Sequence, residues 1–136
     1  MTQDSFNKIV DQIYAEDPRY EKGSYTFLRQ ALDHTVKVLH KDEDASKHRH
    51  VSGVELLEGI REFALEQYGP LTLTVLNHWG IYRCEDFSNI VFNLIEYRVL
   101  GKTDSDKKED FVNGYDFHDA FAAPYMPAPS NTKKQT

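Results

Sequence analysis

Cysteine is nearly absent from this sequence, which contains a single one, Cys84, among 136 residues. One cysteine excludes an intrachain disulfide, and with it the disulfide-stapled folds of small secreted proteins. Long apolar runs are also missing, since no stretch approaches the roughly 20 apolar residues that span a bilayer. The opening segment MTQDSFNKIVDQIY lacks the basic flank and long apolar run of a signal peptide. We therefore expect a cytoplasmic protein that does not bind membranes.

An excess of basic charge is missing as well. The chain has 16 Lys and Arg against 22 Asp and Glu, a net charge of −6, and no basic stripe. Nucleic acids and anionic membranes bind mainly through neutralisation of their phosphates, so this balance argues against both as partners. The stretch from Leu76 to Phe92 superficially resembles a helix-turn-helix. Its second helix would begin with Glu85 and Asp86, however, and lacks the side chains that read base edges.

What is present is an ordinary globular composition, with 40% hydrophobic and 28% charged residues. A chain of this length buries roughly two-thirds of the surface that its unfolded form exposes, so a single domain folds without staples. We predict an all-α, compact bundle of about five helices. The helical domain is expected over residues 1–110, and a C-terminal aromatic-acidic strap and flexible tail over residues 111–136.

Apolar residues at helical spacing predict four long helices. They cover about residues 3–15, 23–39, 53–68 and 85–100. Ser24 is the expected N-cap of the second helix, and Ser52 with Glu55 forms a capping box at the start of the third. Gly101 is expected to end the last helix. The charged segment from about residue 40 to residue 50 has no apolar periodicity and predicts an exposed loop.

Residues 71–78 fit two patterns. Leucine and valine alternate with threonine there, as in a strand, but the apolar residues also fit a short helix. We favour the helix, because no second strand is evident to pair with it and because Pro70 and Gly80 bracket a helix well. Gly80 followed by the apolar Ile81 also fits a left-handed C-cap.

Arg61 is the first candidate for a binding residue. It falls inside the apolar arc of the third helix, where a buried arginine needs a carboxylate partner. Asp17, Asp86 and Glu96 are the possible partners. The residue is then either a structural ion pair that fixes helix register or an anion-binding arginine in a cleft. Arg98 falls similarly on the last helix, but near its end, where the charged head reaches water.

The segment Asp17-Pro18-Arg19-Tyr20 joins the first two helices. Such a loop is suited to ligand binding, or it is a turn in which Asp17 bonds nearby backbone and Arg19 is paired on the surface. A basic patch at residues 47–50 contains His48 and His50. Two histidines alone rarely hold zinc, so we predict no metal and no cofactor. His50 also precedes a predicted helix N-terminus, where a small anion is favoured.

Catalytic signals are weak. Cys84 lies near a predicted helix N-terminus, a position that lowers the pKa of a thiol. No His–Asp pair is visible to complete a relay, so we interpret Cys84 as a partly buried spectator. We predict no catalytic residue, and the sequence leans against an enzyme.

The segment from Phe111 to Tyr125 is the strongest functional candidate. Tyr115, Phe117 and Phe121 stand among acidic residues in a stretch too apolar for a free linker and too short for a domain. Either this strap folds back on its own core, or its aromatic side chains dock into another chain. A swapped homodimer would satisfy both descriptions.

Several short motifs resemble those of a known family. They are Asp17-Pro18-Arg19-Tyr20, His50-Val51-Ser52-Gly53, Glu55-Leu56-Leu57, Gly59-Ile60-Arg61, Gly69-Pro70, Trp79-Gly80-Ile81, Asp86-Phe87, Ile90-Val91-Phe92-Asn93-Leu94, Tyr115-Asp116-Phe117 and Ala120-Phe121. On these motifs, which cover most of residues 6–121, the chain resembles a family of small, functionally uncharacterised proteins found chiefly in planctomycete and verrucomicrobial bacteria. A hydroxyl residue is usual there at the position of Cys84 and a glycine at that of Ser88. The resemblance thus implies no essential chemistry at these two positions, and no activity.

These features favour a non-enzymatic protein-interaction or adaptor domain. Its mechanism would be docking of the strap aromatics on a partner protein or on a second copy of the chain. The alternative is a small-ligand or anion-binding regulatory domain, in which Arg61, Arg19 and His50 supply the positive groups and Asp17 completes the site.

Overall fold

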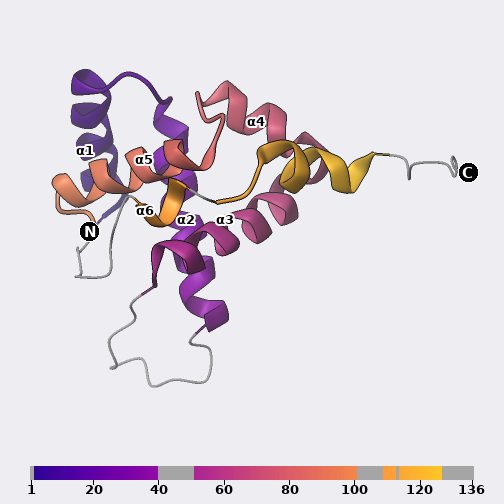
Figure 1. Ribbon diagram of the computed structural model, residues 1–136. Coiled ribbons are helices and arrows are strands. Elements are labelled where there is room, and N and C mark those ends of the chain that lie inside the picture. Colours follow the sequence, from indigo (N-terminus) through magenta and orange to yellow (C-terminus); the bar gives the residue numbers. More distant parts are fainter. Residues whose placement is uncertain (1, 40–50, 101–108, 113, 127–136) are drawn as a thin grey trace, which may run out of the picture.

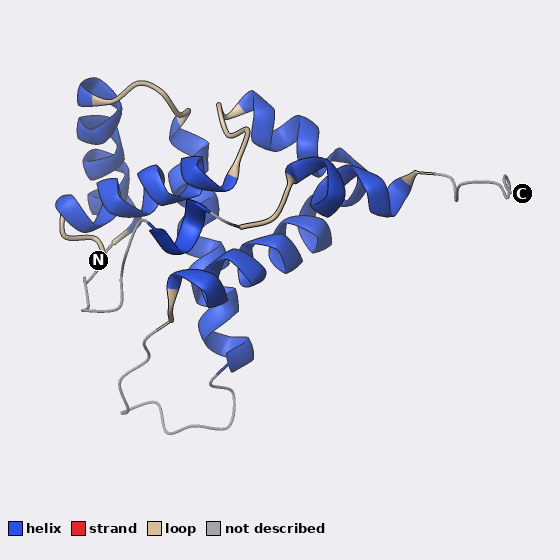
Figure 2. Ribbon diagram, in the orientation of Figure 1, coloured by secondary structure: helices blue, strands red, loops and turns tan. Residues whose placement is uncertain are grey.

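The computed structural model describes residues 2–39, 51–100, 109–112 and 114–126 (Figure 1). Every regular element in these ranges is a helix (Figure 2). The elements are α1 (Gln3–Glu16), α2 (Lys22–Leu39), α3 (Gly53–Tyr68), η1 (Gly69–Leu71), α4 (Thr72–His78), α5 (Cys84–Glu96), α6 (Glu109–Val112), η2 (His118–Ala122) and η3 (Ala123–Tyr125). The prediction of an all-α bundle is confirmed. None of the described helices is long and apolar enough to cross a membrane.

The start of α2 differs from the prediction. The helix begins at Lys22, so Ser24 lies inside the first turn and is not its N-cap. The Ser24 side chain is buried, and its hydroxyl donates to the carbonyl of Glu21 at 2.7 Å. The N–H of Glu21 donates to the carbonyl of Trp79 at 3.1 Å. This long-range bond fixes where the chain enters the helix, which local capping chemistry does not reveal.

Helices α2 and α3 pack against each other at very short range, and they cross in Figure 1. The capping box predicted for α3 is present: Glu55 N–H donates to Ser52 Oγ at 3.1 Å, and Ser52 N–H donates to Glu55 Oε1 at 3.0 Å. Gly59 permits the close approach, because a Cβ built there would lie 1.8 Å from Thr35 Oγ1. Val54 is 62% exposed, so it does not belong to the face of α3 that packs in the core.

Residues 71–78 contain a helix, as we favoured. The short η1 leads into α4, whose end has the geometry expected of a left-handed C-cap. Gly80 has a φ of 89°, and the N–H of Ile81 donates to the carbonyl of Leu76 at 2.9 Å. A glycine is favoured at this position because L side chains strain the left-handed conformation.

The end of α5 was predicted wrongly. The helix ends at Glu96, four residues before Leu100, and Gly101 lies outside the described residues. The N–H of Val99 donates to the carbonyl of Leu94 at 2.8 Å, which is the bond of a Schellman C-cap. Arg98 occupies the left-handed position with a φ of 63° and is exposed, so it does not lie on an apolar helix face.

The strap packs on the core of its own chain. In Figure 1 it runs from α6 to the yellow helical turns η2 and η3 beside α4. Four of its apolar side chains, Phe111, Phe117, Ala120 and Phe121, are buried, whereas Val112 and Tyr125 are exposed. The strap thus realises the first of the two arrangements left open by the sequence.

Candidate functional site

The α1–α2 loop and the start of α5 line an open cleft of about 460 Å³, which we call the basic cleft. It is lined by Arg19, Tyr20, Gly80, Arg83, Glu85, Asp86 and Asn89. Two arginines from segments far apart in the sequence therefore meet at one surface depression. The carbonyl of Arg19 lies only 2.5 Å from where a Cβ of Gly80 would be, so the two loops touch directly.

A hydrogen-bond network fixes the floor of the basic cleft. Tyr20, which is 2% exposed, donates its hydroxyl to Asp86 Oδ1 at 2.7 Å and accepts from Asn89 Nδ2 at 2.9 Å. Burial raises the pKa of Tyr20 to about 12. The other oxygen of Asp86 accepts the backbone N–H groups of Tyr82 at 2.8 Å and Arg83 at 3.2 Å. The charge of Asp86 is thus compensated by donors of its own chain.

Arg19 is held in place from behind. Its Nε and Nη2 atoms donate to the two oxygens of Asp17 at 2.8 and 2.7 Å, and Asn93 Nδ2 donates to Asp17 at 2.9 Å. These bonds hold the pKa of Asp17 well below its usual range, and the bonds from Arg19 have the largest effect. The guanidinium carbon lies 5.3 Å from the centre of the Tyr20 ring. The Arg19 side chain is nevertheless 57% exposed.

The turn interpretation of this loop and the binding interpretation are therefore compatible. Asp17 forms the local pair that a turn would have, and the same pair orients the guanidinium of Arg19. The bidentate bonds use Nε and Nη2, which leaves Nη1 without a bond to Asp17. Asp17 accordingly positions Arg19, and the free edge of the guanidinium is the group available to a ligand.

Arg83 and Asn89 are site residues that sequence reasoning missed. The Arg83 side chain is 74% exposed, and its Nη1 lies 3.7 Å from Glu85 Oε1. Asp86, three residues after Arg83, accepts the Arg83 N–H and closes the first turn of α5. That spacing was the available signal, since an acid at the third helical position often bonds back to the N-cap residue.

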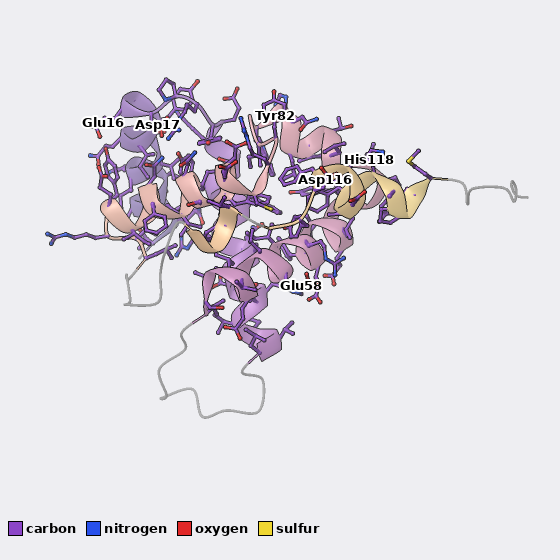
Figure 3. All side chains as sticks on the ribbon, in the orientation of Figure 1. Glu16, Asp17, Glu58, Tyr82, Asp116 and His118 are labelled. Atoms are coloured by element: carbon purple, nitrogen blue, oxygen red, sulfur yellow. The ribbon has the colours of Figure 1, made fainter. Side chains whose placement is uncertain are left out.

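Arg61 does not lie in the basic cleft, and the partners predicted for it are wrong. Its side chain is 33% exposed and pairs with Glu58 of the preceding turn, with Nε 3.1 Å from Glu58 Oε1. Figure 3 shows Glu58 on α3, far from the loop that carries Asp17. A carboxylate three residues away satisfies the arginine locally, so no distant acid is needed. His50, the other predicted cation, lies outside the described residues.

The three aromatic residues predicted to bind are packed against their own chain. The ring of Phe121 makes edge contacts with those of Tyr115 at 5.6 Å and Phe117 at 5.0 Å. The Tyr115 hydroxyl donates to the carbonyl of Leu57 at 2.8 Å, and burial raises the pKa of Tyr115. In this conformation these side chains stabilise the bundle and are not free to dock elsewhere.

Cys84 lies beneath the strap. The side chain is 4% exposed, and its thiol donates to the carbonyl of Tyr115 at 3.4 Å. Burial raises the pKa of Cys84 to about 11. Burial therefore outweighs the helix N-terminus, and the thiol is protonated at neutral pH, as a spectator would be.

Asp116, His118 and Asp119 bring their potential ligand atoms within 4.8 Å of one another, and all three residues are exposed. Asp116 Oδ2 accepts the N–H of Asp119 at 3.1 Å, which is the bond of a side chain capping a turn. Capping accounts for the proximity of Asp116 and Asp119, and exposed acidic groups alone do not indicate a metal site.

Comparisons of the chain with protein-family models, with curated proteins and with solved structures find no match. The resemblance to the planctomycete and verrucomicrobial family stays a hypothesis from short motifs. A functional proposal consequently rests on the geometry of the basic cleft.

Proposed function

We propose that this chain is a non-enzymatic protein-interaction domain that binds an acidic segment of a partner protein in the basic cleft. The observation that carries the proposal is the convergence of Arg19 and Arg83 on one cleft, with Arg19 oriented by Asp17. Guanidinium groups are complementary to carboxylates, because the charges are opposite and the planar pair of N–H donors fits the two carboxylate oxygens. A guanidinium that is already held loses less side-chain entropy when it binds.

The shape of the cleft favours a protein segment over an enclosed small ligand. Small-molecule sites are concave and mostly apolar, whereas this cleft is open and lined mainly by polar side chains. Tyr82, labelled in Figure 3, lies beside Arg83 in the loop between α4 and α5 and is 62% exposed. Tyrosine and arginine are the residue types that dominate binding energy at protein interfaces.

The two acids of the basic cleft have different effects on an acidic ligand. The charge of Asp86 is compensated by hydrogen bonds from Tyr20 and two backbone N–H groups, so Asp86 repels an acidic ligand only weakly. Glu85 is half exposed and lies near the guanidinium of Arg83, where it competes with an incoming carboxylate. We therefore expect Glu85→Gln to tighten binding several-fold, because the change frees Arg83 and removes a like charge.

The direct test is a titration of the ¹⁵N-labelled full chain, followed by NMR. The probe is an acetylated pentaglutamate peptide, and the uncharged comparison is pentaglutamine. We expect pentaglutamate alone to shift the amide signals of residues 80–89 and the Nε–H signal of Arg19. Arg19→Gln and Arg83→Gln should each weaken the interaction several-fold, whereas Lys8→Gln removes an equal charge from the exposed face of α1 and should not. Shifts spread evenly over exposed lysines and arginines would refute the proposal.

The alternative, a small-ligand or anion-binding regulatory domain, is favoured by the same preset guanidinium of Arg19. Phosphate and citrate are therefore titrated in parallel. A small anion that shifts the same amide signals and saturates at lower concentration than pentaglutamate would support this alternative over a protein ligand. Binding of pentaglutamate with no response to either anion supports the interaction domain.

A further inference from the structure

A second cleft, of about 530 Å³, adjoins the basic cleft along the same two loops. It is lined by Tyr14, Glu21, Lys22, Gly23, His78 and Trp79, and we call it the aromatic cleft. Arg19 and Tyr20 of the α1–α2 loop line the basic cleft, and the next three residues, Glu21 and the first two of α2, line the aromatic one. In the other loop the order is reversed, with Trp79 in the aromatic cleft and Gly80 in the basic one. The bond from Glu21 N–H to the Trp79 carbonyl ties the loops together between them.

The core fixes the indole of Trp79 at this position. Its ring lies 5.3 Å from that of Phe27 and meets the Tyr68 ring edge-on at 6.0 Å. Gly23 makes room for it, since a Cβ there would lie 2.9 Å from the indole Nε1. Trp79 is still partly exposed. It therefore offers a rigid aromatic wall, which binds a planar side chain with little loss of its own freedom.

The second aromatic wall is Tyr14 of α1. Lys22 Nζ lies 5.4 Å from the centre of this ring and 2.9 Å from Asp11 Oδ1. Lys22 already supplies the cation on this ring, so the side chain of a basic ligand gains no second cation–π contact there. An aromatic side chain suits the cleft, since it packs against the partly exposed rings of Trp79 and Tyr14.

Resting on the proposed function, we infer that the two clefts form one bipartite docking surface. The partner is a protein segment that places an acidic side chain in the basic cleft and an aromatic side chain in the aromatic cleft. Each loop passes from one cleft to the other within a few residues. The two clefts share both loops, so one extended segment that advances about 3.3 Å per residue places its acid and its aromatic residue within a few positions of each other.

Selection from a phage-displayed library of random 12-residue peptides on the immobilised full chain tests this inference. We expect enrichment of Asp or Glu with Phe, Tyr or Trp within a few positions of it. Tyr14→Ser should remove the aromatic preference and keep the acidic one. Arg19→Gln combined with Arg83→Gln should do the reverse. Tyr125→Ser, which changes an exposed tyrosine of η3, is the matched control and should alter neither preference.

Trp79 provides a second readout, because it is the single tryptophan of the chain. A selected peptide should shift its fluorescence emission. Replacing the aromatic residue of that peptide with alanine should abolish the shift and weaken binding about tenfold. This measurement uses the unmodified protein, so it does not depend on how a variant folds.

The outcomes separate the two proposals. Enrichment of acids without aromatic residues, or a selected peptide that leaves the Trp79 emission unchanged, overturns the bipartite surface and leaves the proposed function standing. Enrichment without acids overturns the proposed function, and the bipartite surface with it. A library from which no sequence is enriched overturns both.

Discussion

Replacing Gly59 with alanine is expected to destabilise the bundle, although the same change inside an exposed helix is stabilising. Alanine is favoured over glycine in a helix interior by about 1 kcal/mol. At Gly59, however, the added Cβ would lie 1.8 Å from Thr35 Oγ1, 2.7 Å from its Cβ and 2.9 Å from its Cγ2. A new rotamer of Thr35 relieves the first and third contacts but not the second. Helices α2 and α3 therefore have to move apart.

The magnitude follows from these two opposing terms. Overpacking a dense core costs about 1–3 kcal/mol, and a forced backbone shift belongs at the upper end of that range. Alanine's better helix propensity offsets about 1 kcal/mol of this cost, so the free energy of unfolding should fall by about 2 kcal/mol. A new Thr35 rotamer also gives up the buried bond that Thr35 Oγ1 donates to the carbonyl of Ala31, one turn earlier in α2, at 2.7 Å.

Urea denaturation measures this loss, with far-UV circular dichroism for helix content and Trp79 fluorescence for packing. Thr35→Ala in the Gly59→Ala background is the coupled test, because it removes Oγ1 and Cγ2 and leaves one short contact. The double variant should be more stable than the sum of the single changes predicts. A Gly59→Ala variant as stable as the original chain, or independent effects of the two changes, would refute the close-approach explanation.

Three further predictions concern single residues. Arg98→Gly should raise the free energy of unfolding by about 1 kcal/mol, because glycine adopts the left-handed conformation without strain; an unchanged urea midpoint would contradict this. Asp17→Asn should lower the free energy of unfolding by about 1 kcal/mol at pH 7. The difference between the variant and the original chain should shrink as the pH falls below 3.8. The sign follows from the lowered pKa of Asp17, whose stabilisation is present above its ordinary value of 3.8 and lost on protonation; a gap that stays constant down to pH 2 would count against it. Cys84 should react with Ellman's reagent at pH 8 only as fast as the bundle opens, because burial raises its pKa to about 11; rapid labelling of the folded chain would show an accessible thiol.

The sequence predicted best where the deciding contacts are local. The capping box of Ser52 and Glu55 spans one helical turn, and so does the C-cap that Gly80 and Ile81 form on α4. Helical periodicity then located the long helices and the helix within residues 71–78. The class of fold follows from such short-range preferences, because each is satisfied within a few residues of the chain.

Errors arose where a local pattern had two solutions. The apolar spacing of α5 continues to Leu100, but the helix stops at Glu96 because Arg98 takes a left-handed conformation that usually requires glycine. Distant acids were predicted as partners of Arg61 because this residue falls among apolar side chains on a helical wheel. Glu58, one turn away, satisfies it instead. Neither outcome has a strong sequence signal, since each depends on small differences in energy between alternatives.

By itself the sequence determined an all-α bundle, a net acidic charge and one of the two loops of the candidate site, Asp17 to Tyr20. Only the tertiary structure decided that the strap packs on its own core, and that Arg83 and Asn89 join Arg19 in a cleft. The physical reason is that the deciding contacts join residues far apart along the chain. Contacts such as the bond from Glu21 to Trp79 and that from Tyr20 to Asp86 link loops far apart in the sequence. Their formation depends on how whole helices pack, and no local pattern encodes it.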